Sequence, residues 1–213
     1  MKKTIILFLL FSFSFSQNMG ILKTHKNKSG LGVFITSHFM FKSDSRGHNI
    51  RNIPERFRFS LNYSFKTNFE ISLSSGYVEA SSNDGSSESF NNTSLDLRYH
   101  MYKKKWGSSL EINRCKWFPS DQTLDLKALL NNNDISGFGF TLYSKSKYHP
   151  YFSFKNYFYN EEDINQEIFT FGGMRQVEKY ILHWGLSILF DDDSIEISKD
   201  FASFFIGAGM EFF

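Results

Sequence analysis

Three features of the sequence predict an all-β protein, folded as a single antiparallel up-and-down transmembrane β-barrel. Apolar and polar residues alternate with period two in one segment after another. Long and short connections between these segments alternate along the chain. Beyond the N-terminal segment, no apolar run approaches the length of a membrane helix, and the mean hydropathy is −0.34. We count about ten strands, with eight as the alternative.

The N-terminus has the parts of a secretory signal peptide. Lys2 and Lys3 form a basic start, and residues 5–15 form an apolar run too short to span a bilayer. Ser14 and Ser16 are small residues at the −3 and −1 positions, which predicts cleavage after residue 16. We therefore expect a signal peptide at 1–16, a periplasmic lead-in at 17–30 and the barrel at 31–213. An uncleaved anchor helix is the alternative.

The clearest alternation lies between residues 56 and 80. Its first strand sets Phe57, Phe59, Leu61, Tyr63 and Phe65 against Arg56, Arg58, Ser60, Asn62, Ser64 and Lys66. After a short turn the pattern restarts with Phe69, Ile71 and Leu73 on the apolar face. Because side chains of a strand alternate between its two faces, this pattern predicts a hairpin with one apolar side. Pairing numbers that sum to about 134 would place Phe65 opposite Phe69, Tyr63 opposite Ile71 and Leu61 opposite Leu73.

The other strands follow the same pattern. We predict them at 31–41, 93–102, 105–116, 134–145, 148–159, 165–176, 179–190 and 201–213. Long loops are predicted at 42–55, 79–92, 117–133, 160–163 and 191–200, with a short helix over 124–130. Each strand has about the 9–11 residues that a tilted strand needs to cross the hydrocarbon. Since lipid tolerates no open sheet edge, the first and last strands must pair.

Charge differs between the two kinds of connection. The short turns carry Lys66, Lys103, Lys104, Lys105, Lys145, Lys147, Arg175 and Lys179, whereas the long loops carry most of the acids. Trp106, Tyr148 and Tyr180 fall near the turns and Trp117, Tyr159 and Phe190 near the loops, as expected of two interfacial aromatic girdles. The chain has 24 basic and 22 acidic residues, and removal of residues 1–16 takes away two lysines and leaves a formal charge of zero. This balance argues against nucleic acid as a partner.

Together, the signal segment, the alternating strands and the terminal Gly209-Met210-Glu211-Phe212-Phe213 resemble small bacterial outer-membrane β-barrels of the broad OmpA-like and porin-like class. The ending is similar to the aromatic C-terminal strand that the barrel assembly machinery reads. The resemblance implies a monomer in the bacterial outer membrane, in contact with lipid and lipopolysaccharide. We expect no OmpA-type peptidoglycan-binding domain after the barrel. It includes no family-specific motif, and the second terminal Phe leaves the outward register of the last strand open by one residue.

Charged residues on the polar faces are the candidate site. They are Arg56, Arg58, Glu70, Asp96, Arg98, Glu111 and Lys155. Pairs summing to about 207 across Lys103-Lys104 place Asp96 opposite Glu111, with Arg98 beside Glu111, so we predict that Arg98 bridges both acids. Buried charges must pair or meet water, so a structural network of ion pairs inside the barrel is favoured. A constriction that selects small ions is the alternative.

Other chemistry has less support in the sequence. A metal site for Ca²⁺ or Mg²⁺ could be formed by Asp191, Asp192 and Asp193 with Glu196. The spacing of these residues is not that of an EF-hand, so a solvated acidic loop is favoured. We therefore expect neither a bound metal nor a cofactor. Cys115 is the only cysteine, so no internal disulfide can form. His183 and Ser187 lie four residues apart on one strand, too far for a direct hydrogen bond.

The sequence therefore predicts a non-catalytic outer-membrane barrel with acidic extracellular loops and a structural or surface-interaction role. A narrow porin-like diffusion channel for small solutes or ions is the first alternative, and a barrel enzyme acting on lipid or peptide is a remote one. The rival fold is a soluble lipocalin-like barrel with its phenylalanines packed inward.

Overall fold

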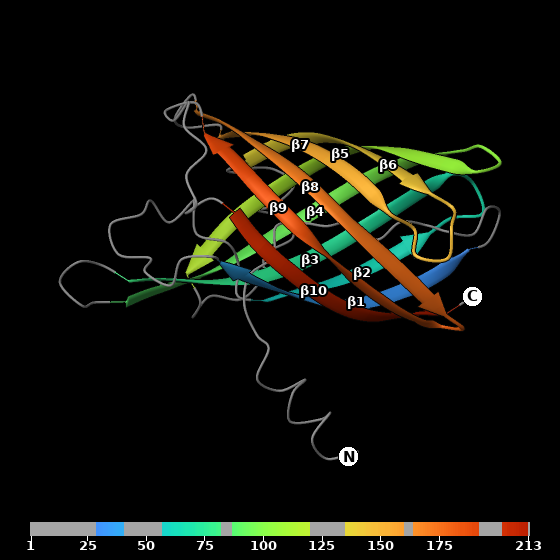
Figure 1. Cartoon of the computed structure of the whole chain (residues 1–213). Coiled ribbons are helices and arrows are strands. Elements are labelled where there is room, and N and C mark those ends of the chain that lie inside the picture. The colour runs from blue at the N-terminus through green and yellow to red at the C-terminus, as the bar shows by residue number, and fades with distance from the viewer. Residues whose placement is uncertain are drawn as a thin grey trace, which may run out of the picture.

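Ten antiparallel strands close into one barrel in the computed structural model (Figure 1). The structure describes residues 29–40, 57–81, 87–119, 135–159, 164–191 and 202–212. The strands are β1 (Gly30–Met40), β2 (Phe57–Ser64), β3 (Phe69–Ser81), β4 (Ser87–Tyr102), β5 (Trp106–Pro119), β6 (Ile135–Ser144), β7 (Tyr151–Tyr159), β8 (Ile164–Val177), β9 (Tyr180–Asp191) and β10 (Ala202–Phe212). Neighbours along the chain pair with each other, and β1 pairs with β10, which confirms the predicted closure.

No helix within the described ranges is long and apolar enough to cross a membrane. Several expectations concern residues outside those ranges. They are the signal segment 1–16, the lead-in up to residue 28, the loop 42–55, the helix at 124–130, and the side chains of Arg56, Asp192 and Asp193.

The register of the β2–β3 hairpin is as predicted. Leu61 pairs with Leu73 and Tyr63 pairs with Ile71. The turn is closed by the amide of Phe65, which donates to the carbonyl oxygen of Phe69 at 3.0 Å. Alternation excludes registers that slip by one residue, because such a slip would turn one apolar face inward, and the short turn selects among the registers that remain.

The predicted register of β4 and β5 is wrong by two residues. Asp96 pairs with Asn113 rather than with Glu111, and Arg98 lies directly opposite Glu111. The turn includes a third lysine, because β4 ends at Tyr102 and β5 begins at Trp106. The amide of Lys103 donates to the carbonyl oxygen of Trp106 at 2.9 Å and closes this longer turn.

Two of the predicted long loops are partly strand. β3 and β4 continue their ladder as far as the pair Ser81 and Ser87, and β5 continues to Pro119. A run of Ser, Asn and Glu predicts a loop, but these side chains do not interrupt backbone pairing. Beyond the apolar belt, both faces of a strand can meet water while its backbone hydrogen bonds continue.

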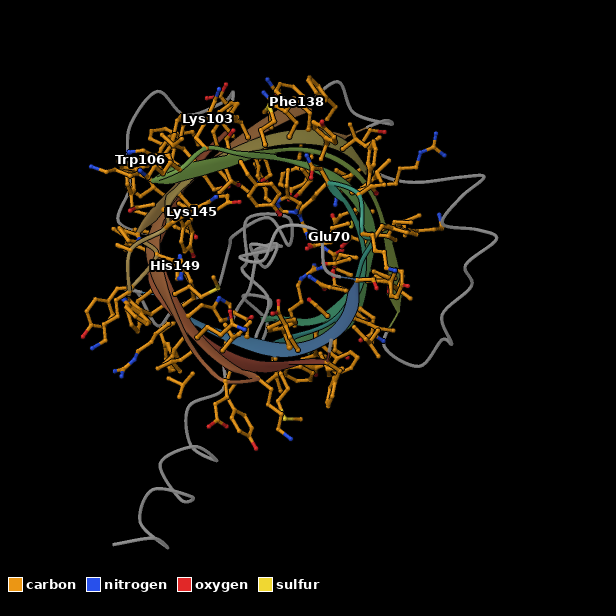
Figure 2. All side chains as sticks on the ribbon, turned by 90° about the vertical axis from the view of Figure 1, so that its right-hand side faces the viewer. Glu70, Lys103, Trp106, Phe138, Lys145 and His149 are labelled. Carbon is orange, nitrogen blue, oxygen red and sulfur yellow. The ribbon has the colours of Figure 1, made fainter. Side chains whose placement is uncertain are left out.

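The barrel is apolar outside and polar inside. Phe59, Phe138 and Phe171 are 48%, 47% and 50% exposed, whereas many charged and hydroxyl side chains are buried inside. Figure 2 looks from the end that bears the short turns, and it shows Glu70 directed into the barrel and Phe138 directed away from it. This orientation excludes the soluble barrel with inward phenylalanines.

The last strand follows the same rule. Its even-numbered residues Phe204, Ile206 and Phe212 are exposed on the outer face, and Glu211 is buried. Phe212, one of the two terminal phenylalanines, therefore faces outward, which determines the register that the sequence left open.

Inside the barrel, aromatic rings lie over glycines of the neighbouring strand. Among the described strands, the directly paired residues of this kind are Tyr143 with Gly107, Tyr157 with Gly137, Tyr151 with Gly172, Phe205 with Gly185, His183 with Gly207 and Phe34 with Gly209. A Cβ at Gly107 would lie 2.3 Å from the Tyr143 ring, so only glycine allows the ring to lie flat on the wall. Several of these rings join Met174 and Ile181 in a buried apolar cluster.

Candidate functional site

A row of charges with alternating sign crosses the interior from β3 to β7. Glu70 pairs with Arg98, and Arg98 pairs with Glu111. Gly139 pairs with Glu111 on one side and with Lys155 on the other. Directly paired residues point to the same face of a sheet, so these side chains enter the barrel at one level. We use the term interior charge network for Arg58, Glu70, Asp96, Arg98, Glu111 and Lys155.

Arg98 is the centre of this network. Its Nη1 lies 2.7 Å from Glu70 Oε1 and its Nη2 lies 3.4 Å from Asp96 Oδ2, while its Nε forms an ion pair with Glu111 Oε2. Three nitrogens of one planar guanidinium thus contact three carboxylates on three strands, a geometry that the point charge of lysine could not reproduce. Arg98 contacts both acids that the sequence suggested, and Glu70 is a third partner that the sequence did not assign to it.

Lys155 reaches the network across a glycine. Its Nζ lies 2.5 Å from Glu111 Oε1, although β6 separates the two strands. A Cβ at Gly139 would lie 3.2 Å from Lys155 Cγ and 3.3 Å from the carbonyl oxygen of Phe154. The absence of a side chain at Gly139 therefore leaves room for the lysine chain.

Hydroxyl and amide groups hold the β2 side of the network. Arg58 Nη1 donates to Ser74 Oγ at 2.8 Å and to Ser94 Oγ at 2.9 Å. Glu70 accepts from Asn62 Nδ2 at 3.3 Å and from Ser64 Oγ at 3.3 Å. These contacts give Arg58 and Glu70 hydrogen-bond partners that replace water.

The interior charge network is balanced in charge and buried. It has three basic and three acidic side chains, and each is at most 6% exposed. Leaving one buried charge without a partner would cost several kcal/mol. The acids contact Arg98, and Glu111 also contacts Lys155, so the arrangement joins β3, β4, β5 and β7. Chemically, it offers ion pairs that hold strands together.

Two buried histidines of the described strands, His100 and His183, have contacts on the inner wall of the barrel. His183 Nε2 lies 3.0 Å from Thr36 Oγ1, and Ser187 Oγ lies 3.1 Å from Thr170 Oγ1. His100 faces a carboxylate, with its Nε2 at 3.5 Å from Glu70 Oε2, inside the interior charge network. The part of the chain that the structure describes brings together no group of three or more His, Cys, Asp or Glu side chains that could hold a metal ion.

The polarity of the wall indicates the solvent on each side. Exposed aromatic and aliphatic side chains cover the outside of a closed barrel, and paired charges fill its inner face. Exposing this outer surface to water would be unfavourable, whereas contact with acyl chains is favourable. Closure of the barrel also gives the backbone groups of every strand a hydrogen-bond partner, which lipid cannot supply. The chain is a closed ten-stranded β-barrel whose outer wall suits contact with lipid.

Comparisons with known proteins do not identify a family for this chain. No protein-family model matches the sequence, and no curated protein matches it. Among solved structures, the barrel is similar to an anion-selective porin from Comamonas acidovorans, with 12% identity and a TM-score of 0.34 over 75% of this chain and 50% of the porin. The chain thus spans half the length of the porin.

Two structures of one smaller protein are also similar. The outer-membrane protein Ail of Yersinia pestis, in a phospholipid bilayer nanodisc, has 12% identity and a TM-score of 0.35 over 87% of this chain and all of that chain. The crystal structure of Ail, the attachment invasion locus protein, has 8% identity and a TM-score of 0.33 over 88% of this chain and all of that chain. At these identities the likeness concerns the fold alone.

Proposed function

We propose that this chain is a non-catalytic outer-membrane barrel with a structural or surface-interaction role, in which the interior charge network stabilises the wall and does not conduct ions. The observation that carries the proposal is the contact of Arg98 with Glu70, Asp96 and Glu111 through three different nitrogens. An arginine committed to three acids on three strands is a cross-link between those strands.

A selective constriction needs charges that can exchange partners with passing ions. In this network the carboxylates of Glu70 and Glu111 are 2% and 6% exposed and already contact basic groups. A passing cation would have to displace Arg98 or Lys155, at a cost of several kcal/mol for the group left unpaired. Paired and buried charges therefore favour the structural role over the diffusion channel.

The apolar cluster near the turn end also supports this choice. Tyr143 and Phe205 are 0% exposed, and they pack with Phe34, Tyr151 and Ile181 inside the barrel. Rings at this position occupy interior space that a water-filled pore would need.

The surface-interaction part of the proposal is based on the sequence. The long loops carry most of the acidic residues, so they would present negative charge outside the cell. We further propose that the barrel assembly machinery inserts the chain through its aromatic last strand, and that the chain acts as a monomer among lipid and lipopolysaccharide.

Planar-bilayer recording tests the proposal. The purified full chain should insert without stepwise conductance. A variant with Glu70, Arg98, Glu111 and Lys155 all replaced by alanine should also give no conductance steps, because the buried rings near the turn end still occupy the interior. Folding of both proteins is checked by heat-modifiable migration on a gel. Regular conductance steps from the parent protein would refute the structural role and favour the channel.

A further inference from the structure

The short turns form a basic rim at one end of the barrel. They connect β2 to β3, β4 to β5, β6 to β7 and β8 to β9 at the end where β10 finishes, on the right of Figure 1. We use the term turn-end cations for Lys66, Lys103, Lys104, Lys105, Lys145, Lys147, Arg175 and Lys179. Within the described turns, Glu178 is the acid that opposes them. This end of the barrel therefore has a strongly positive surface.

Three consecutive lysines at this rim are held in an ordered turn. The amide of Lys145 donates to the carbonyl oxygen of Lys105 at 2.9 Å, and Lys145 Nζ donates to the carbonyl oxygen of Lys103 at 2.7 Å. Lys103, Lys104 and Lys105 are exposed, and among the described residues none of them has an ion-pair partner. Like charges this close repel each other, so an anion from outside the chain would relieve the repulsion.

Aromatic rings fix several of these cations at the edge of the apolar belt. Lys147 and Arg175 lie 5.7 Å and 5.8 Å from the centre of the Tyr148 ring, and Lys179 lies 5.5 Å from that of Tyr180. Tyr148 and Tyr180 are 50% and 53% exposed. Exposed aromatic rings of membrane proteins lie at the headgroup level, so the neighbouring cations would lie at the level of the lipid phosphates.

Trp106 shows the same arrangement next to the lysine turn. It is 51% exposed and directly follows Lys105. Figure 2 shows Trp106 and Lys103 together on the outer side of the rim. An indole in the interfacial region with ammonium groups beside it fits a lipid whose acyl chain contacts the ring and whose phosphate meets the lysines.

We propose that the turn-end cations bind the headgroups of anionic phospholipids in the membrane leaflet at that end of the barrel. Charge complementarity and the adjoining interfacial aromatic rings identify this occupant, because a soluble anion would need the cations but not the exposed rings. The inference rests on the membrane placement in the proposed function. A basic side chain near an anionic surface strengthens association by about fivefold, so preference for an anionic over a zwitterionic lipid should be about two- to fivefold at one lysine turn.

Fluorescence quenching by brominated lipids tests this preference in the full chain. Trp117→Phe and Trp184→Phe leave Trp106 as the reporter at the rim. The protein is reconstituted in phosphatidylcholine vesicles that contain brominated phosphatidylglycerol or, at the same mole fraction, brominated phosphatidylcholine. Brominated phosphatidylglycerol should quench Trp106 with a relative association constant about two- to fivefold higher, falling towards one at high salt because salt screens the charges.

A charge variant and a matched control show whether the rim is responsible. The ratio of the two association constants, for brominated phosphatidylglycerol over brominated phosphatidylcholine, should fall close to one in the triple variant Lys103→Gln, Lys104→Gln and Lys105→Gln. Arg114→Gln with Lys116→Gln, which removes two cations farther along β5, should leave the ratio unchanged. A ratio near one in the parent, or a preference that survives the triple substitution, would overturn the proposal. If the triple variant does not fold, a parent ratio that is insensitive to salt would overturn it as well.

Two further outcomes distinguish failure of the membrane placement from failure of the headgroup proposal. Absence of quenching by both brominated lipids would refute the membrane placement itself, whereas equal quenching by both would refute only the headgroup proposal. Inorganic phosphate is added at an ionic strength matched by chloride. Loss of the preference in phosphate but not in chloride would show that inorganic phosphate and the lipid headgroup compete for the same cations, which supports a phosphate-binding rim.

Discussion

Replacing Arg98 with glutamine should destabilise the barrel more than replacing any exposed cation. The substitution removes the guanidinium that contacts Glu70, Asp96 and Glu111. Those three carboxylates are at most 6% exposed, so water cannot take its place without a rearrangement of the interior. The change leaves negative charge buried inside the wall.

The structure also indicates the size of the effect. Removing one partner of a buried ion pair costs about 3–5 kcal/mol. Two compensating contacts remain, since Lys155 Nζ stays 2.5 Å from Glu111 and Asn113 still donates to Asp96. We therefore expect a loss of about 3 kcal/mol in the free energy of unfolding, towards the lower end of that range. Arg98→Lys should lose about 1–2 kcal/mol, because it keeps the charge but not the three-way geometry.

Urea unfolding in phospholipid vesicles, followed by tryptophan fluorescence, measures these differences. Arg175→Gln is the matched control, because Arg175 is exposed at the turn end, and it should change the free energy by less than about 0.5 kcal/mol. A double-mutant cycle of Arg98→Gln with Glu70→Gln should give a coupling of about 1–3 kcal/mol. If Arg98→Gln were as stable as the parent within about 1 kcal/mol, the view of the network as a cross-link would be refuted.

Three other substitutions probe different parts of the wall by the same unfolding measurement. Gly139→Val should lose about 1–3 kcal/mol, because its side chain would collide with Lys155 Cγ, 3.2 Å from the added Cβ; stability equal to the parent would mean that the lysine does not need this space. Phe205→Ala should lose about 3–5 kcal/mol, because it empties a fully buried site and uncovers Gly185, and a loss below about 1 kcal/mol would contradict this packing. Glu178→Gly should gain about 0.5–1 kcal/mol, because Glu178 has a φ of 55°, which glycine adopts without strain; a loss of stability would contradict this reading of the turn.

The sequence predicts the two faces of the barrel wall well, because the side on which a residue lies depends on its neighbours in the same strand. Alternation along one strand determines which side chains point outward, and this was sufficient to predict Phe59 on the outside and Arg58 on the inside. A tight turn between two such strands then determines the register, as it does for Leu61 and Leu73. Where the turn included one more lysine, at 103–105, the predicted register slipped by two residues.

Contacts inside the barrel depend on strands that are distant in sequence, and the sequence pattern did not show them. Glu70 and Arg98 are 28 residues apart, and Glu111 and Lys155 are 44 apart. A role for Gly139 could be seen only once β6 lay between the two charged strands. The signal that could have pointed to it is a glycine on the inward face of a strand, where a small residue marks a close approach from a neighbour.

The orientation of the wall is best tested by nitroxide scanning of β2 in vesicles. Single cysteines are placed at each position from Phe57 to Ser64 in a Cys115→Ser background, and each label is exposed to oxygen, which partitions into lipid, or to a water-soluble nickel chelate. We predict high oxygen accessibility at the odd-numbered positions 57, 59, 61 and 63, and little access for either reagent at the even-numbered ones. Odd positions that are open to the nickel chelate, or closed to both reagents, would contradict the central claim that the phenylalanines of this barrel face lipid.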